Sequence, residues 1–448
     1  MRYRDIRGLR GDLVYKYTAS TGHDHNIYDY VMRVMGAHII ALKEADAIPG
    51  EAYHSIARAL LKLWDSDPSA ILSGDYEDVF EAVEDRLHSM IGDDAGWIGL
   101  GRSRNDHVSA SLRLYTAESL AEIALLLVDL REALLEKASQ YSGTPIPGYT
   151  HGQPSQVITG ACLFQAYEES LSDATEAIIH AAHASLKSPL GAGAGGGTLV
   201  GLDERLLASL LGFNGVYNSP YYAVASRAFL HYAAQTLVLA MVELSRIAED
   251  LISLASEGII LLPQEHIATS SIMPHKANPV TLEILRARTG DAIAGLQAIA
   301  VIQAKLRYSY NLDLQEANKH LYTLVETLRD AINILIDIIR RIKIDEEKAF
   351  HILEKTKPWS AEAAEKLALT RRQPLRKAYR EIAEKIRQGT WPTATPQQVL
   401  EERKTGCTKH KKKEDNKIRE HRDKATRLKN KLKEKSENIK QKLATQQK

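Results

Sequence analysis

The sequence predicts an all-α protein built around a bundle of long helices. Between about Asn105 and Arg341, apolar residues recur at intervals of three and four over very long stretches, which is the helical repeat. A helix of about 30 residues is a rod of roughly 45 Å, longer than an ordinary globular domain needs, and such rods usually pack as bundles. Strand patterns are scarce. Together these observations favour three helical domains around a long central bundle.

The rest of the chain divides around this region. With 448 residues, 44% of them hydrophobic and 26% charged, the chain has a globular composition and enough length for two or three domains. Both flanking segments show shorter helical patterns. We expect an N-terminal helical domain, a central bundle, a small C-terminal helical domain and a basic tail, in that order, at residues 1–104, 105–344, 345–408 and 409–448.

Some of the long helices carry apolar residues on more than one side, as in the run from Ile123 to Val128 and in that from Ile332 to Ile339. Such helices need neighbours on several sides. A second copy of the bundle is the simplest source of these neighbouring helices, so we expect a homo-oligomer. A large monomeric helical domain is the alternative.

Composition also indicates the cellular compartment and whether a structural metal is expected. No apolar run approaches the roughly 20 residues of a membrane-spanning helix, and the first residues lack the apolar stretch of a secretory signal, so we expect a cytoplasmic protein without membrane contact. Only Cys162 and Cys407 are present, too few for a disulfide framework or a zinc cluster. We expect no structural metal.

The C-terminal tail has the opposite charge to the body. From Glu401 onward there are 18 Lys and Arg against 8 Asp and Glu, which leaves 40 against 49 before it. Leu428, Leu432, Ile439 and Leu443 keep rough helical spacing. We interpret the tail as a solvated, frayed helix or a disordered segment; the alternative is a basic arm for RNA or for the acidic bodies of neighbouring subunits.

The segment from Thr269 to Asn278 is the first candidate for chemistry. It is a polar, cationic loop between long helices, where catalytic residues tend to lie. We predict that Asn278 caps the following helix, with Pro279 in its first turn, so that Lys276 lies at a helix end suited to an anion. Ser270 and Ser271 beside this charge could act as a base or nucleophile, or could simply solvate the loop.

Five blocks, in order, carry a resemblance to a known family. TSSIMPHKANP (269–279) is similar to the GSSxMPxKxNP signature of the fumarase, aspartase and argininosuccinate lyase superfamily. GRSRNDHVSASLRLY (101–115) resembles the block that distinguishes argininosuccinate lyases within it. YNLDLQE (310–316), GYTHGQPSQ (148–156) and SPLGAGAGGGT (188–198) complete the set. The resemblance implies a homotetramer with a twenty-helix core and active sites where three subunits meet.

The resemblance also implies a reaction and its residues. The family cleaves argininosuccinate reversibly to arginine and fumarate by β-elimination, the last step of arginine biosynthesis, without a cofactor. A doubly charged carbanion must be stabilised by cations and hydrogen-bond donors. By resemblance, Ser270 removes the proton, with Ser271 the less favoured substitute; Lys276 and Asn278 stabilise the carbanion; and His151, paired with Glu283, protonates the leaving group. The substrate-binding residues implied are Ser20, Ser103, Arg104, Asn105, Thr150, Ser271, Asn278, Tyr310 and Gln315.

The sequence departs from the family pattern at several positions. Thr269 replaces a glycine, Phe80 a histidine, Ala228 an aspartate, and Asn318 a frequent lysine. Thr269 is expected to stiffen a loop that is mobile in the family, and the other changes bear on substrate identity. Two alternatives therefore stay open, namely a lyase acting on another succinyl or aspartyl adduct, and a catalytically silent structural homologue. The GxGxxG run at 191–196 lacks a βαβ context, so we do not expect a dinucleotide site.

Overall fold

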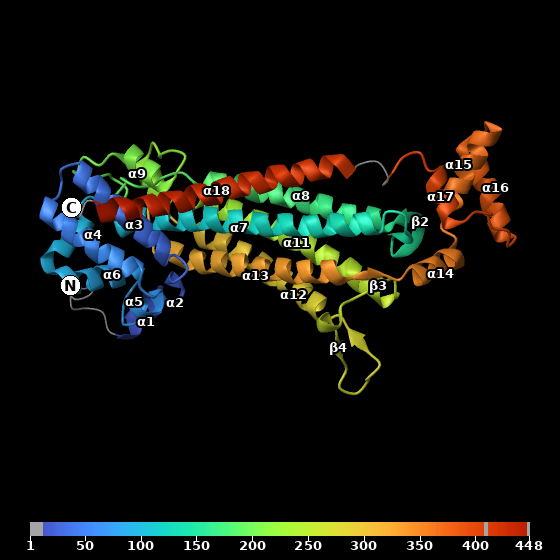
Figure 1. Ribbon diagram of the computed structural model, residues 1–448, viewed down its shortest axis with the longest axis horizontal. Coiled ribbons are helices and arrows are strands. Elements are labelled where there is room, and N and C mark those ends of the chain that lie inside the picture. Colours follow the sequence, from blue (N-terminus) through green and yellow to red (C-terminus); the bar gives the residue numbers. More distant parts are fainter. Residues whose placement is uncertain (1–11, 407–410, 446–448) are drawn as a thin grey trace.

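The computed structural model describes residues 12–406 and 411–445 and is almost entirely helical (Figure 1). Seven helical segments precede the long helices and cluster at one end of an elongated molecule. They are α1 (Asp12–Thr18), α2 (Thr21–Asp24), α3 (Tyr28–Glu44), α4 (Gly50–Trp64), α5 (Pro68–Leu72), α6 (Val79–Ile91) and the 3-10 helix η2 (Gly92–Gly99). The predicted all-α fold class is confirmed.

Five long helices form the central bundle. They are α7 (Arg104–Gln140), α8 (Gly160–Ser185), α11 (Ala228–Ser256), α12 (Val280–Gln303) and α13 (Asp313–Arg341). At about 1.5 Å per residue, the 37 residues of α7 span about 55 Å. Helix α7 packs against α8 and α13, while α12 packs against α11 and α13. The short helices α9 (Glu204–Leu211) and α10 (Pro220–Ala225) lie in the connection between α8 and α11.

A small unit of short helices lies at the opposite end of the bundle from α1–α6 (Figure 1). It consists of α14 (Glu346–Thr356), α15 (Ser360–Arg371), α16 (Leu375–Arg387) and α17 (Pro396–Glu402). Helix α14 contacts the hairpin of β1 (Pro145–Thr150) and β2 (Gln153–Thr159), and the two-residue strands β3 (Ile260–Leu261) and β6 (Lys343–Ile344) pair where α13 leads into this unit. The three domain boundaries stay a prediction.

The basic C-terminal segment corrects our interpretation of a frayed or disordered tail. It forms one helix, α18 (Lys411–Thr445), which runs back along the bundle and packs on α7, α8, α3, α4 and α9 (Figure 1). Leu428, Leu432, Ile439 and Leu443 are all buried. Their spacing of four, seven and four residues places them on one face of the helix, and that face is covered by the bundle rather than by solvent.

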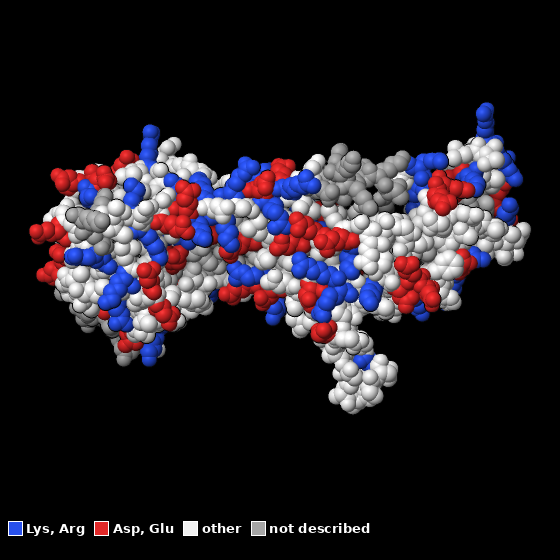
Figure 2. Space-filling view, viewed as in Figure 1, with Lys and Arg blue, Asp and Glu red and all other residues white. Residues whose placement is uncertain are grey.

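Ionic contacts add to this packing. Arg422 binds both Asp129 and Glu132 of α7 at 2.8 Å, and Lys429 lies 2.9 Å from Glu122. The basic charge of the segment is thus partly matched by acidic residues of its own chain. Figure 2 shows the resulting intermixture of basic and acidic side chains along this side of the bundle.

A buried polar cluster joins α18 to α7 and α8. The Arg131 guanidinium donates to Glu168 at 2.7 Å and to Ser172 at 3.0 Å, and its third contact is His421 Nδ1 at 2.8 Å. Because a guanidinium can only donate, His421 Nδ1 must accept, which requires a neutral ring. Burial and the Arg131 charge lower the pKa of His421 to about 4, in agreement with that geometry.

Two further findings concern the expectations on membranes and cysteines. Within residues 12–406 and 411–445, no helix combines the length and apolar character needed to cross a membrane. Cys162, near the start of α8, is disulfide-bonded. Cys407, the only other cysteine in the sequence, lies outside the described residues.

Candidate active site

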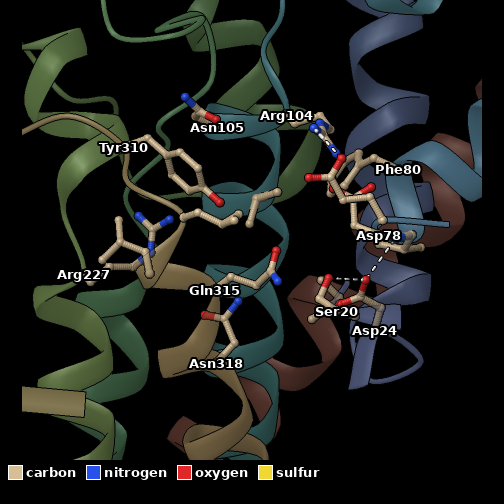
Figure 3. A pocket seen from close by; sticks show the side chains of 16 residues that line it. Ser20, Asp24, Asp78, Phe80, Arg104, Asn105, Arg227, Tyr310, Gln315 and Asn318 are labelled. Carbon is tan, nitrogen blue, oxygen red and sulfur yellow. Dashed lines mark hydrogen bonds and ion pairs between the residues drawn. The ribbon is translucent and has the colours of Figure 1, made fainter. Parts of the chain in front are cut away.

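A cleft lies between the N-terminal helices and the adjoining ends of three bundle helices (Figure 3). Five residues that the sequence nominated for substrate binding line it: Ser20, Arg104, Asn105, Tyr310 and Gln315. Ser20 precedes α2, Arg104 and Asn105 begin α7, Tyr310 lies just before α13, and Gln315 lies in its first turn. Residues from three separate parts of the chain therefore meet in one place.

The RSRND block builds the start of α7. The Ser103 side chain accepts a hydrogen bond from Asn105 N at 2.9 Å, and Asp106 Oδ1 accepts one from Ser103 N at 3.1 Å, which completes a capping box. Asp106 Oδ2 accepts from Gly193 N at 3.0 Å, so one carboxylate joins the block to the glycine-rich loop. Burial raises the pKa of Asp106 to about 7. Ser103 thus acts here as a helix cap and does not line the cleft.

One wall of the cleft is acidic. Arg104 contacts Asp78 at 2.7 Å and Glu77 at 3.5 Å. Asp24 Oδ2 accepts hydrogen bonds from Ser20 Oγ at 2.8 Å and from Val79 N at 2.9 Å. Burial and the neighbouring charge of Asp78 raise the pKa of Asp24 to about 7. Asp24 therefore fixes the rotamer of Ser20 and holds α2 against the start of α6.

The facing wall comes from α13 and from the start of α11. Gln315 Nε2 donates to Thr18 O at 2.9 Å, which fastens α13 to the end of α1. Tyr310 is half-buried. Burial raises the pKa of its phenol, and the positive charge of Arg227 partly offsets that rise. Arg227 and Asn318 complete this wall (Figure 3).

The predicted elimination residues lie elsewhere. A hairpin arm, residues 268–278, projects sideways from the bundle (Figures 1 and 2). Strand β4 (Ala268–Thr269) pairs with β5 (Ala277–Asn278), and the arm carries Ser270, Ser271 and Lys276. Ser271 and Lys276 are exposed and Ser270 is half-buried. At its base, His266 Nε2 lies 2.7 Å from Asp337 of α13, which anchors the arm to the bundle.

Our prediction that Asn278 caps the next helix is wrong. Helix α12 begins at Val280 with Pro279 at its N-cap, and no side chain caps it. Asn278 is instead in β5, paired with Ala268, because the extended hairpin continues to this residue. Glu283 lies exposed in the first turn of α12.

His151 occupies a tight hairpin turn that the sequence analysis did not predict. Strands β1 and β2 form an antiparallel hairpin, with Thr150 paired to Gln153. His151 and Gly152 between them both have positive φ, 53° and 68°, as the central residues of a type I′ turn require. A histidine in this conformation is uncommon and indicates a constraint beyond local preference. Both His151 and Thr150 are exposed, at the end of the bundle away from the cleft (Figure 1).

One copy of the chain thus presents the nominated residues at three places: the cleft, the arm and the β1–β2 turn. Within the described residues, no group of three or more His, Cys, Asp or Glu side chains is arranged to hold a metal ion.

Comparison with known proteins supplies the family. A family model described as "Lyase" matches residues 6–293. An argininosuccinate lyase from Pyrobaculum calidifontis is 39% identical over 401 residues, covering 89% of this chain and 92% of that protein. One from Sulfolobus acidocaldarius is 40% identical over 386 residues, covering 86% and 84%. The chain belongs to the argininosuccinate lyase family.

Solved structures agree on the fold. A variant of EDDS lyase with bound fumarate has a TM-score of 0.83 at 20% identity, covering 97% of this chain and 93% of its own. A class II fumarase from Schistosoma mansoni has a TM-score of 0.72 at 17% identity, covering 87% and 94%. The family resemblance that rested on five sequence blocks is confirmed.

Within this family, the cleft also contains residues that the motifs did not nominate, namely Asp24, Glu77, Asp78 and Arg227. Glu77 and Asp78 lie three and two residues before Phe80, and Arg227 lies directly before Ala228; Phe80 and Ala228 were both noted as departures. The departures at Phe80 and Ala228 could therefore have drawn attention to these neighbouring residues. Phe80 and Asn318 themselves line the cleft, so two of the four departures are gathered at one site.

Proposed function

We propose that this protein is an argininosuccinate lyase, which splits argininosuccinate reversibly into L-arginine and fumarate. The observation that carries the proposal is the RSRND block at the start of α7, whose Arg104 and Asn105 face the cleft in a chain about 40% identical to argininosuccinate lyases. We place the reaction in the cytoplasm, as the last step of arginine biosynthesis, with no cofactor.

The proposed elimination uses the chain's own side chains. Ser270 takes a proton from the carbon next to a carboxylate of the succinyl group, and the electron pair left behind becomes the carbon–carbon double bond of fumarate. The bond to the guanidino nitrogen breaks, and that nitrogen receives a proton from His151. Lys276 and Asn278 stabilise the carboxylate on which negative charge accumulates, and this is where preorganised donors lower the barrier most. Glu283 orients His151.

This scheme requires more than one copy of the chain, and we propose a homotetramer with active sites shared between subunits. Helix α12 supports the proposal. Ile284, Ile293 and Val301 of this helix are 55%, 39% and 68% exposed, so several large apolar side chains of α12 face solvent in a single copy. Such a helix is normally covered on several sides. A second bundle packed there would also bring the arm of one copy toward another copy.

The test is to mix the purified protein with argininosuccinate and follow fumarate by its ultraviolet absorbance. We expect wild-type protein to form fumarate and Ser270→Ala to lose activity by at least about 100-fold, as loss of a general base typically does. Ser209→Ala, an exposed serine on α9, is the matched control. No fumarate from wild type would overturn the proposal and would direct attention to other succinyl or aspartyl adducts.

Shared sites are tested by mixing. Ser270→Ala and Arg104→Gln homo-oligomers are each expected to be nearly inactive. Co-refolding them must restore part of the activity if the two residues of one site come from different copies. No recovery in a verified hetero-oligomer would contradict the shared-site arrangement.

A further inference from the structure

The outermost helix pair of the C-terminal unit carries a dense group of basic side chains. Residues 371–387, which run from the end of α15 through α16, contain five Arg and two Lys against two Glu. The two helices lie at the end of the molecule opposite to α1–α6 and the cleft (Figure 1). Basic side chains are prominent at this outer end (Figure 2). None of them belongs to the proposed elimination.

Most of these cations have no acidic partner. Both glutamates of the segment are engaged, because Glu381 accepts a hydrogen bond from Arg371 at 2.7 Å and Glu384 lies 2.5 Å from Arg387. Concentrated positive charge that the protein does not neutralise attracts polyanions. The remaining cations are all exposed and form no ion pair with another described residue: Arg372, Arg376, Lys377, Arg380 and Lys385.

The other basic helix, α18, differs in this respect. Lys424 lies 2.6 Å from Glu420 and Lys440 lies 2.8 Å from Asp65, in addition to the contacts with α7 described above. Much of the basic charge on α18 is thus matched within the chain. On α16, by contrast, the cations lack such partners, so α16 is the better candidate for a polyanion-binding surface.

An exposed tyrosine lies among the arginines of α16. Tyr379 is 57% exposed, and the exposed Arg376 and Arg380 lie three residues before it and one residue after it. Residues three and four apart are neighbours on a helix surface, so Arg376 and Arg380 share one face with Tyr379 at its edge. Leu375, one turn before Tyr379, is 51% exposed. The surface therefore offers guanidinium groups beside an accessible aromatic ring.

This chemistry fits a single-stranded nucleic acid. A membrane-bound amphipathic helix inserts a broad apolar face, but the apolar Ala378 and Ile382 of α16 are buried and α16 packs on α15. An acidic protein surface would match the charge alone. A single-stranded nucleic acid uses both features, because its phosphates pair with guanidinium groups while an unpaired base stacks on the ring.

We propose that α16 and the adjoining end of α15 bind single-stranded RNA, with Arg372, Arg376 and Arg380 on phosphates and Tyr379 stacked on a base. RNA is the occupant because it is the abundant single-stranded nucleic acid of a cell. The surface and the cleft lie at opposite ends of the chain. RNA binding is therefore a second activity that does not depend on the proposed elimination.

The test is the fluorescence anisotropy of a fluorescein-labelled oligouridylate titrated with the full chain. We expect the wild type to bind with a Kd on the order of 10⁻⁶ M. Replacing Arg372, Arg376 and Arg380 together by Gln should lower the slope of log K against log salt by about 2 and weaken binding about 100-fold at about 0.1 M salt, since each phosphate contact to a single strand contributes about 0.7 to that slope.

The tyrosine is tested separately. Tyr379→Ala should weaken binding roughly 5- to 150-fold without changing the salt slope, because a base–aromatic stack is lost and no charge is removed. Tyr379→Phe keeps the ring and should bind like the wild type. The same oligouridylate in a duplex with oligoadenylate must bind more weakly, because its bases are no longer free to stack.

A matched control removes the same charge elsewhere. Arg419→Gln, Arg427→Gln and Lys433→Gln combined change three exposed cations of α18 and must leave the RNA affinity unaltered. Circular dichroism and sedimentation velocity verify that every variant keeps the wild-type fold and oligomeric state.

Three results would each overturn the proposal. The first is equal weakening by the α16 and α18 triple variants, which would make net charge the cause. The second is binding of the duplex, or of poly-L-glutamate, as tight as that of the single strand. The third is a smaller sedimenting species for the α16 triple variant, which would make this surface a contact with an acidic region of another copy.

Discussion

The position of α18 can be tested by adding one methyl group to α3. Gly36 lies in the middle of α3, and a Cβ there would approach Ile439 Cγ2 to 2.7 Å and Leu443 Cδ1 to 3.2 Å. In a helix interior, Gly→Ala ordinarily stabilises by about 1 kcal/mol. Here overpacking costs about 1–3 kcal/mol, because the β-branched Ile439 is buried and cannot swing away. We expect Gly36→Ala to lower the free energy of unfolding by up to about 2 kcal/mol.

A double-mutant cycle separates the two contributions. Ile439→Ala alone is expected to destabilise by about 2–5 kcal/mol, but it removes the clash. In that background Gly36→Ala should become stabilising by about 1 kcal/mol, a reversal of sign. Leu428→Ala, another buried position of α18, is the matched control in which Gly36→Ala must stay destabilising.

The measurement is guanidinium unfolding followed by circular dichroism at fixed protein concentration, since an oligomer's stability depends on concentration. If Gly36→Ala raises the free energy of unfolding of the otherwise unaltered chain, α18 does not lie against α3. The same conclusion follows if Gly36→Ala is destabilising and remains so in the Ile439→Ala background.

Three further predictions concern buried ionisable groups. The pKa of His421 is about 4 in the folded chain and 6.5 in the unfolded chain, so between these pH values unfolding takes up a proton and the free energy of unfolding should fall as the pH drops. His421→Gln should flatten this dependence of the unfolding free energy on pH. Asp24 should give the opposite pH dependence: its pKa is raised from 3.8 to about 7, so its contribution to stability declines as the pH rises through that range. Asp24→Asn should remove this decline, and an unchanged pH profile of stability would contradict the raised pKa. Asp106→Ala leaves the Ser103 and Gly193 amides without their acceptor, which costs about 1–3 kcal/mol for each amide. The variant should have a lower unfolding midpoint and form fumarate more slowly, whereas Asp106→Asn, which keeps an acceptor oxygen, should lose less stability and less activity.

The long helices were predictable because their signal is local. The apolar repeat from Asn105 to Arg341 needs no knowledge of partners, and the observed helices begin at Arg104 and end at Arg341. The five sequence blocks located Arg104, Asn105, Tyr310 and Gln315, which share the cleft. The hairpin turn at His151 was missed, since its neighbours carry no alternating apolar pattern.

The tail shows why composition alone misleads. Its dense charge is typical of a solvated helix, yet the four widely spaced apolar residues are enough to bury one face when a long complementary groove is available. Whether such a groove exists depends on α3, α7 and α8, which lie hundreds of residues earlier in the chain. The same holds for His421, whose buried contact with Arg131 spans 290 positions.

Local sequence therefore determines the helices, the RSRND cap and the nominated chemistry, because each depends on neighbours within one or two helical turns. Tertiary structure decides which side chains share a cleft, and it alone leaves Arg227 and Asn318 buried with unsatisfied polar atoms on a wall facing Asp24 and Asp78. The physical reason is that burial and pairing are properties of the packed arrangement: a charge becomes costly, and hence informative about a ligand, only when the fold has removed its water.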